Sequence, residues 1–256
     1  MPYFDQINLK ILAEKFRDLS KREIILRKSF IVRDYMSESA KEYAHHGVAR
    51  RLSVIAHCIE KIFTGLPPEN EDVPQFKVLI DTTIYIQAFV FNVYGVLDNL
   101  AFIWVYEKGI KKPNGQPLPK GRIGLTFDKQ DVRQSFSPEM QAYLDTCNDW
   151  LAYLEGFRHS LGHRIPLYIP PFTVNPAQAD LYQDLENRKT AALIQHENRV
   201  DYDRLEAEQN ALRRFKPWMK HSFNDPTPPV VFHAQVLADF ASVEEICQKV
   251  LLELDR

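Results

Sequence analysis

One short string of the sequence, RHSLGH from Arg158 to His163, gathers side chains that can take part in chemistry. The imidazole of His163 can accept or donate a proton, because histidine titrates close to neutral pH. The guanidinium of Arg158 is permanently charged and presents a planar fork of donors that fits a phosphate group. His159 can orient the same phosphate or share the proton transfer. These residue types together predict proton transfer beside a bound phosphate.

The first element that must position this string is a helix predicted over residues 137–162. Ser137 is a natural N-cap, and Pro138 suits the first helical position, where no amide hydrogen is needed. Gly162 is expected to end the helix in the left-handed conformation, and Pro166 keeps the following residues extended. Apolar residues recur in between at the spacing of one buried helix face: Met140, Tyr143, Leu144, Cys147, Trp150, Leu151, Leu154, Phe157 and Leu161.

The second element is the most apolar stretch of the chain, residues 74–108. Its length would suit a membrane span. Four polar residues interrupt it: Gln87, Asn92, Asp98 and Asn99. Because a carboxylate is costly inside lipid, we predict the central helix of a bundle, covered on most sides, and no membrane attachment. Asp98 and Asn99 either hold hydrogen bonds inside that bundle or face Arg158 and set its position.

Two helical regions are predicted before this central helix. Residues 5–35 form one helix or two, since Ser20 with Glu23 could cap a second piece. Residues 39–63 form another helix, which ends near Gly65. Its inward face is predicted from apolar spacing: Leu52, Ile55, Ile59, Ile62 and Phe63.

Glycines, prolines and basic residues fill the stretch 108–136, which is predicted to be irregular. It is either a solvated loop or a loop that contacts phosphate near the site. After the central string, a long polar helix is predicted over 175–215; it could project, form an antiparallel hairpin or join a partner. A loop over 217–229 and a last helix starting at Ser242 follow, while residues 230–241 fit either a strand or a helical turn.

Composition sets the broad class of the protein. The 256 residues are 45% hydrophobic and 26% charged, as in soluble globular proteins, and the formal charge of −2 gives no strong bulk attraction to nucleic acid. Three scattered cysteines indicate reduced thiols in a cytosol, and the first ten residues lack the apolar core of a secretion signal. We therefore expect a cytoplasmic protein.

The 158–163 string resembles the signature of the HEPN superfamily, which has an arginine, a polar residue, three further residues and a histidine. In that family the motif ends a late bundle helix that packs on an earlier long hydrophobic helix. The resemblance covers roughly residues 75–171, including RIPLYIPP after the string, and departs at Gly162, where alanine is common in the family. It implies an all-α helical bundle of HEPN type within a single domain, 1–256, with additional helices over 5–65 and 176–256.

What the resemblance implies for function is RNA cleavage without a metal ion, in a toxin or defence role. In such enzymes the ribose 2′-hydroxyl attacks the adjacent phosphate, so RNA is cut and DNA is not. By resemblance the catalytic residues are Arg158, His163 and His159, supported by Asp98, Asn99 and Arg164. No metal and no cofactor are implied. Two motifs commonly face each other across a dimer, so a homodimer is expected, with RNA and an antitoxin or other protein as further partners.

Three alternatives stay open at this point. The first is a catalytically silent HEPN module that binds nucleotide, RNA or a protein; the near-neutral charge counts against tight RNA binding. The second is purely structural, because a helix dipole favours cations such as Arg158 and Arg164 at the carboxyl end. The third is a zinc or iron site, since His159 and His163 share a helix face with Glu155.

Overall fold

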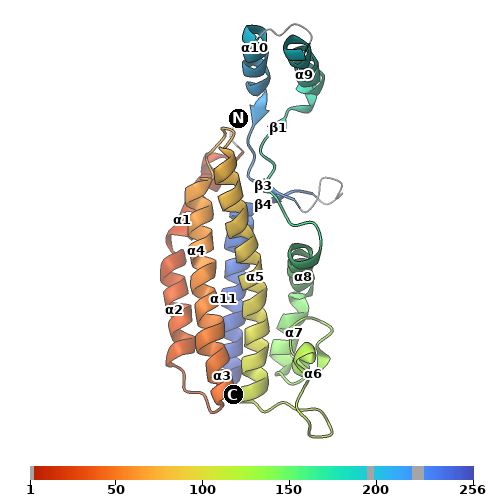
Figure 1. Cartoon of the computed structure of the whole chain (residues 1–256). Coiled ribbons are helices and arrows are strands. Elements are labelled where there is room, and N and C mark those ends of the chain that lie inside the picture. Colours follow the sequence, from red (N-terminus) through yellow and green to blue (C-terminus); the bar gives the residue numbers. More distant parts are fainter. Residues whose placement is uncertain (1–2, 195–198, 221–227) are drawn as a thin grey trace.

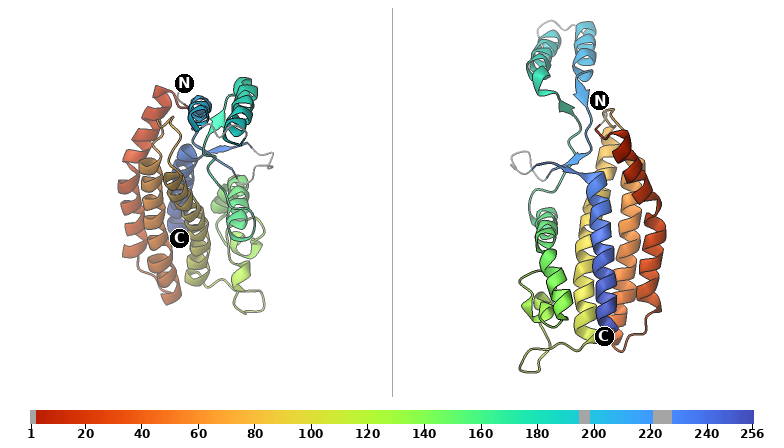
Figure 2. Two further views of the ribbon diagram at one scale, coloured as in Figure 1. Left: turned by 45° about the horizontal axis from the view of Figure 1, so that its top comes forward. Right: turned by 180° about the vertical axis from the view of Figure 1, so that it is seen from behind.

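The computed structural model describes residues 3–194, 199–220 and 228–256, and over these ranges the chain is all-α apart from four strands of two residues each. The predicted all-α fold is thereby confirmed. Buried side chains of the body form one large hydrophobic core. The long helices of the body run side by side (Figures 1 and 2): α1 (Gln6–Arg17), α2 (Leu19–Val32), α4 (Ala49–Gly65), α5 (Phe76–Glu107) and α11 (Phe232–Leu254).

The predicted amino-terminal helix is divided in two at Asp18, but the predicted cap of its second piece is wrong. Ser20 and Glu23 lie inside α2. The Glu23 carboxylate is buried, where it accepts hydrogen bonds from Arg27 Nε at 2.6 Å and from Ser53 Oγ at 3.1 Å. Tertiary contact with α4 thus takes the side chain that a local capping pattern would have used.

The helix predicted over residues 39–63 is present, with one departure from regular geometry. α3 (Glu38–Glu42) leads into η1 (Tyr43–Val48), a π-helical segment, which continues into α4. π-helical turns of this kind occur often at functional sites, because they redirect the side chains around them. The predicted inward face of α4 is confirmed, since all five of its residues are buried: Leu52, Ile55, Ile59, Ile62 and Phe63.

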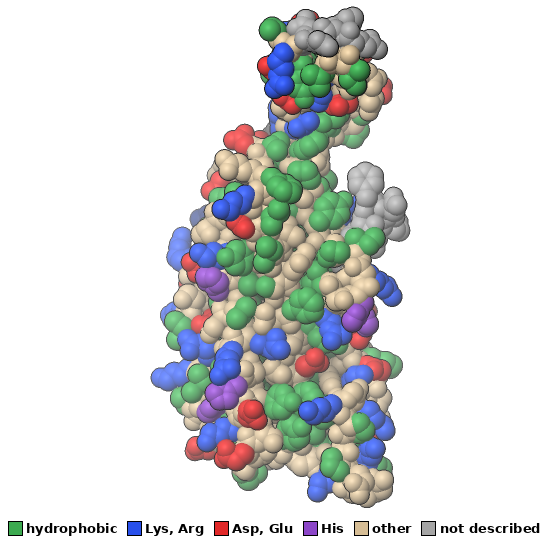
Figure 3. Space-filling view, viewed as in Figure 1, with side chains coloured by type: hydrophobic (Ala, Val, Ile, Leu, Met, Phe, Trp, Pro, Cys, Tyr) green, Lys and Arg blue, Asp and Glu red, His purple; other side chains and the backbone are tan. Residues whose placement is uncertain are grey.

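The apolar helix α5 is the central helix of the bundle, as predicted, and contacts α3, η1, α4, α8 and α11. It is long and apolar enough to cross a membrane, but 56% of that apolar window is buried inside the protein. The prediction that this helix is covered on most sides is nevertheless only partly right. A stripe on its amino-terminal half stays exposed, visible as the hydrophobic upper part of the face in Figure 3: Phe76, Ile80, Ile84 and Phe91.

The last helix begins ten residues earlier than predicted. α11 starts at Phe232, so Ser242 and Glu245 lie within the helix and not at its start. The reason is that Phe232, Val236 and Phe240 extend the same apolar face towards the amino end, and all three are buried. For residues 230–241 the sequence fits either a strand or a helical turn, and both are present. β4 (Val230–Val231) pairs with β3 (Trp218–Met219), and the helix follows directly.

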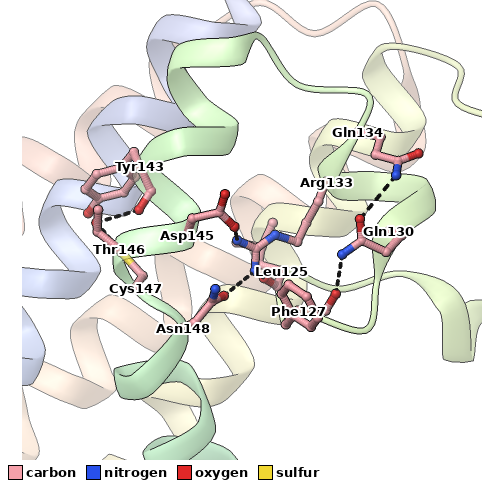
Figure 4. A network of polar contacts seen from close by, with 10 residues as sticks. All are labelled: Leu125, Phe127, Gln130, Arg133, Gln134, Tyr143, Asp145, Thr146, Cys147 and Asn148. Carbon is pink, nitrogen blue, oxygen red and sulfur yellow. Dashed lines mark hydrogen bonds and ion pairs between the residues drawn. The ribbon is translucent and has the colours of Figure 1, made fainter.

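The basic stretch 108–136 is irregular, as predicted, but it is anchored to the body. It contains the short elements η2 (Lys120–Arg122) and α6 (Gln130–Arg133), and several of its apolar residues are buried. Arg133 is the anchor, as Figure 4 shows. Its buried guanidinium donates to Leu125 O at 3.3 Å, to Asn148 Oδ1 at 2.7 Å and to Asp145 Oδ1 at 2.9 Å.

The helix predicted over residues 137–162 is two helices, α7 (Pro138–Thr146) and α8 (Asn148–His163), with a break at Cys147. The Ser137 cap is confirmed, since its hydroxyl accepts from the Met140 amide at 3.2 Å. The predicted end near Gly162 is confirmed to within one residue, since α8 ends at His163, but the predicted left-handed cap is wrong, because Gly162 has no positive φ and is helical. After α8, Gln87 Nε2 donates to Leu167 O at 3.1 Å and holds the extended strip against α5.

The polar helix predicted over 175–215 is an antiparallel hairpin that projects from the end of the body (Figure 1). η3 (Pro176–Gln178) leads into α9 (Ala179–Ile194), which packs against α10 (Arg199–Asn210) around its own small core. The pairing of β1 (Thr173–Val174) with β2 (Arg213–Arg214) closes the base of the hairpin. Within the predicted loop 217–229, residues 221–227 lie outside the described ranges.

Candidate functional site

The predicted histidines lie at the carboxyl end of α8, exposed to solvent. Because α8 stays helical through Gly162, His159 and His163 are four positions apart and project within about 40° of each other. Their ring centroids are 5.7 Å apart. Arg164 follows as the exposed C-cap residue. The structure therefore brings the two imidazoles together on one face, with a guanidinium beside them in the chain.

Arg158 lies on another side of the same helix. Its guanidinium carbon is 5.2 Å from the centre of the Tyr94 ring on α5, a cation–π contact that typically contributes about 0.5–2 kcal/mol. The side chain is half-buried, yet its nitrogens keep contact with solvent, and no hydrogen bond or ion pair to it is found among the described residues. Arg158 is thus neither sealed in the core nor neutralised by a carboxylate in contact.

The structure does not bring Arg158 and His163 onto one helix face. Five positions at 3.6 residues per turn place the two side chains about 140° apart around α8. Arg158 points to the α5 side, whereas His163 is exposed. The pair that the sequence motif singles out is therefore divided between the body contact and the solvent face.

Asp98 belongs to the layer between α5 and α8. Burial raises the pKa of its carboxyl to about 6, and the positive charges of Arg158, Arg51 and Lys129 oppose this rise. Burial likewise raises the pKa of Tyr94 to about 12, with the nearby charge of Asp98 adding to the effect. Of the two placements predicted for Asp98, proximity to Arg158 is the one seen, together with a second arginine that the sequence pattern did not associate with it.

Asn99, turned about 100° from Asp98 around α5, faces α4. Its Oδ1 accepts a hydrogen bond from Arg51 Nε at 3.1 Å, and Asn92 Oδ1 accepts from the Nη1 of the same arginine at 3.2 Å. Asn92 is itself oriented, because its Nδ2 donates to Ala88 O at 2.7 Å. Two neutral amides thus hold a guanidinium that has no carboxylate in contact within the described part of the chain.

Glycines make this arrangement possible. A β-carbon on Gly95 would lie 2.7 Å from Arg51 Nε, so only glycine lets the guanidinium rest on α5 here. A β-carbon on Gly47 would lie 2.7 Å from Asn99 Oδ1, so the π-helical segment η1 can approach α5 closely for the same reason. Glycine inside a helix lowers stability by about 0.5–1 kcal/mol relative to alanine, and this applies to both Gly95 and Gly47.

A cleft of about 590 Å³ opens over these groups, between η1, α4 and α5. Its cationic lining comes from Arg50, Arg51 and Lys120, and Glu42 is the one carboxylate among its lining residues. Figure 3 shows Lys, Arg and His side chains gathered over the lower part of α4 and α5 on this face. Lys120 comes from the basic stretch 108–136, so that stretch does reach a cationic cleft, although on the side of α5 away from α8.

Sequence reasoning missed Arg51 as a site residue. The α5 residues that contact Arg51 do carry a signal in the sequence. Asn92, Gly95 and Asn99 are three and four residues apart, which puts them on one face of an otherwise apolar helix. A polar and small stripe on a buried helix predicts a polar partner. Nothing in the local pattern of α4 identifies that partner as Arg51, because its neighbour Arg50 carries the same charge and is exposed.

A metal centre finds no support in the geometry of the described residues. Among them, no three His, Cys, Asp or Glu side chains are grouped so that they could hold a metal ion.

Comparison with known proteins adds no assignment, since no protein-family model, curated protein or solved structure matches the chain. HEPN membership therefore stays a prediction from the 158–163 motif.

Proposed function

We propose that this protein cuts RNA without a metal ion, at the carboxyl end of α8. One observation carries the proposal: His159 and His163 are exposed on the same helix face with ring centroids 5.7 Å apart. Cleavage by an internal hydroxyl needs one group to remove a proton and another to supply one. Two imidazoles one helical turn apart can take these roles near neutral pH.

The proposed step uses only groups of the RNA and of this chain. One imidazole removes the proton of the ribose 2′-hydroxyl, and the 2′ oxygen forms a bond to phosphorus. The bond from phosphorus to the 5′ oxygen breaks, and the second imidazole donates its proton to that leaving oxygen. The products are a 2′,3′-cyclic phosphate and a free 5′-hydroxyl. Arg164 is exposed and follows His163 in the chain, and in this proposal its guanidinium stabilises charge on the phosphate.

The roles differ in one respect from those implied by the HEPN resemblance. There Arg158 and His163 act on one phosphate, but here Arg158 contacts Tyr94 and faces α5. In this proposal Arg158 is a positioning residue that holds α8 against the body, with Asp98 nearby. His159 becomes the partner of His163, and Asn99 serves the separate Arg51 cleft.

The test is cleavage of end-labelled RNA in excess chelator by the wild type, His159→Gln and His163→Gln. His57→Gln is the matched control, because His57 is also an exposed helical histidine, on α4, with no part in the proposal. Loss of a general acid or base slows such reactions by about 10²–10⁴-fold, so both site variants should lose activity to that extent. The control should not change, and DNA of the same sequence should stay intact.

Equal cleavage by wild type and His163→Gln would mean that the activity comes from elsewhere, and the proposal would be abandoned. Absence of cleavage by pure wild type would leave the catalytically silent module. The same proposal includes a cytoplasmic homodimer and a protein partner such as an antitoxin. Light scattering of the purified chain measures its oligomeric state, and a homodimer is the expected result.

A further inference from the structure

We propose a second site, a nucleotide-binding cleft between η1, α4 and α5 that recognises its ligand through phosphate. Arg50, Arg51 and Lys120 supply three positive charges to this cleft of about 590 Å³. The inference does not depend on RNA cleavage, because none of His159, His163 and Arg164 is among the residues that line the cleft.

The positive charge of the cleft is not neutralised by close contacts. Neither Arg50 nor Lys120 has a side-chain hydrogen bond or ion pair to any described residue, and both are exposed. Arg51 bonds only the neutral oxygens of Asn92 and Asn99 within the same part of the chain. The carboxylates of Glu42 on the rim and of Asp98 close to Arg51 offset part of this charge, but three cations outnumber these two carboxylates, so the cleft keeps a net positive charge for an anion.

Arg51 is held in place before any ligand arrives. A guanidinium has five N–H donors, of which two are used by the amides of Asn92 and Asn99, and the unused nitrogen is not buried. The remaining donors can therefore serve a phosphate in the bidentate fashion typical of arginine. Because Gly95 lets the guanidinium rest on α5, little side-chain freedom is left to lose on binding.

The size and lining of the cleft favour a small ligand over a long polymer. Pockets for small molecules typically measure about 300–1,000 Å³, and this cleft falls within that range. Tyr43 lines it, and its ring is fixed by stacking on Phe102 with centroids 4.6 Å apart, so it offers a rigid aromatic wall. The formal net charge of −2 gives no strong bulk attraction to a polynucleotide. A nucleoside di- or triphosphate combines the groups that such a cleft can contact.

The test is calorimetric titration of the full chain with ATP, pyrophosphate, adenosine and a single-stranded RNA oligonucleotide. Arg50→Met and Lys120→Met remove exposed charges that have no partner among the described residues, so both variants should fold. Lys111→Met is the matched control, because Lys111 is exposed in the same basic stretch but does not line the cleft. His163→Gln separates this site from the α8 end.

ATP and pyrophosphate should bind and adenosine should not. Each cleft variant should weaken ATP binding by about tenfold or more, the usual effect of losing one charged hydrogen bond. Lys111→Met and His163→Gln should bind ATP like the wild type. The proposal is overturned if ATP gives no titratable heat, if both cleft variants bind like the control, or if only the RNA oligonucleotide binds and loses affinity in the cleft variants.

Discussion

Arg51 lies directly on Gly95, with no room between them for a β-carbon, which would sit 2.7 Å from Arg51 Nε. A helix-breaking residue in the middle of the central helix is thereby explained by the cation that covers it. The same contact aligns Arg51 with Asn92 and Asn99, one turn to either side. Much of what can be tested about the cleft depends on this contact.

Gly95→Ala should displace the Arg51 guanidinium without unfolding the protein, because the group that must move is the free end of a flexible side chain. Its hydrogen bonds to Asn92 and Asn99 would be lost, and ATP affinity should fall as in Lys120→Met. Gly156→Ala on α8 is the control, since a β-carbon there meets nothing within 4 Å. The control should gain about 0.5–1 kcal/mol in urea unfolding and keep its ATP affinity. Unchanged ATP binding by Gly95→Ala would show that the Arg51 position does not matter.

Asp98 should make the protein less stable as the pH rises from about 4 to about 6. Burial raises its folded pKa from 3.8 to about 6, so the folded state binds the proton more tightly than the unfolded chain. The stabilisation is fully present below the unfolded pKa and is lost as the pH passes the folded value. The shift corresponds to about 2–3 kcal/mol.

Asp98→Asn should remove this contribution, so urea unfolding at pH 4.5 and 7.5 should differ less in the variant than in the wild type. Asp239, whose pKa is also raised to about 6 by burial, leaves a slope of the same sign in both proteins. An unaltered difference between the two pH values in Asp98→Asn would refute the assignment.

Arg133→Met should loosen the basic stretch that delivers Lys120. It removes the buried donor to Leu125 O and Asn148 Oδ1, which should cost about 2–3 kcal/mol of unfolding free energy. Arg122→Met is the comparison, because its ion pair with Asp131 is largely solvated and is worth about 1 kcal/mol or less. Limited proteolysis should cut between residues 110 and 130 faster in Arg133→Met only. Similar proteolysis of both variants would contradict the anchoring role.

Gly162→Ala should stabilise the end of α8 by up to about 0.5–1 kcal/mol, since the position is helical and a β-carbon there meets nothing within 4 Å. The His159 and His163 rings should keep their relation, so RNA cleavage should not fall. Thermal unfolding and the cleavage assay measure the two effects. A loss of stability would indicate that the backbone at this glycine is not regular helix.

The fold could be predicted where the apolar period is clean, as on α4 and α5, because burial of one face dominates the choice of structure. Local end signals were less reliable. Ser242 with Glu245 and Ser20 with Glu23 both lie inside helices, since core residues such as Phe232 extend the buried stripe past them. The apolar spacing of residues 137–162 continues across Cys147, so the break of the predicted helix at this residue could not be predicted from the sequence.

The candidate site was located only in part. His159 and His163 could be placed at a helix end, but their pairing depended on Gly162 staying helical, which tertiary context decides. For Asp98 and Asn99 the sequence left two placements open, and the structure divides them: Asp98 lies near Arg158, whereas Asn99 bonds to Arg51 on α4. A contact between residues 48 positions apart leaves no trace in local spacing, so the cleft emerges only from the three-dimensional structure.

The chain leaves the body at Thr173 and returns at Arg214, which pair directly across the two-residue ladder. Everything between them, including α9 and α10, is therefore a detour that starts and finishes at one point. A short turn joining these two positions should therefore preserve the path of the remaining chain. The size of that arm can vary independently of both proposed sites.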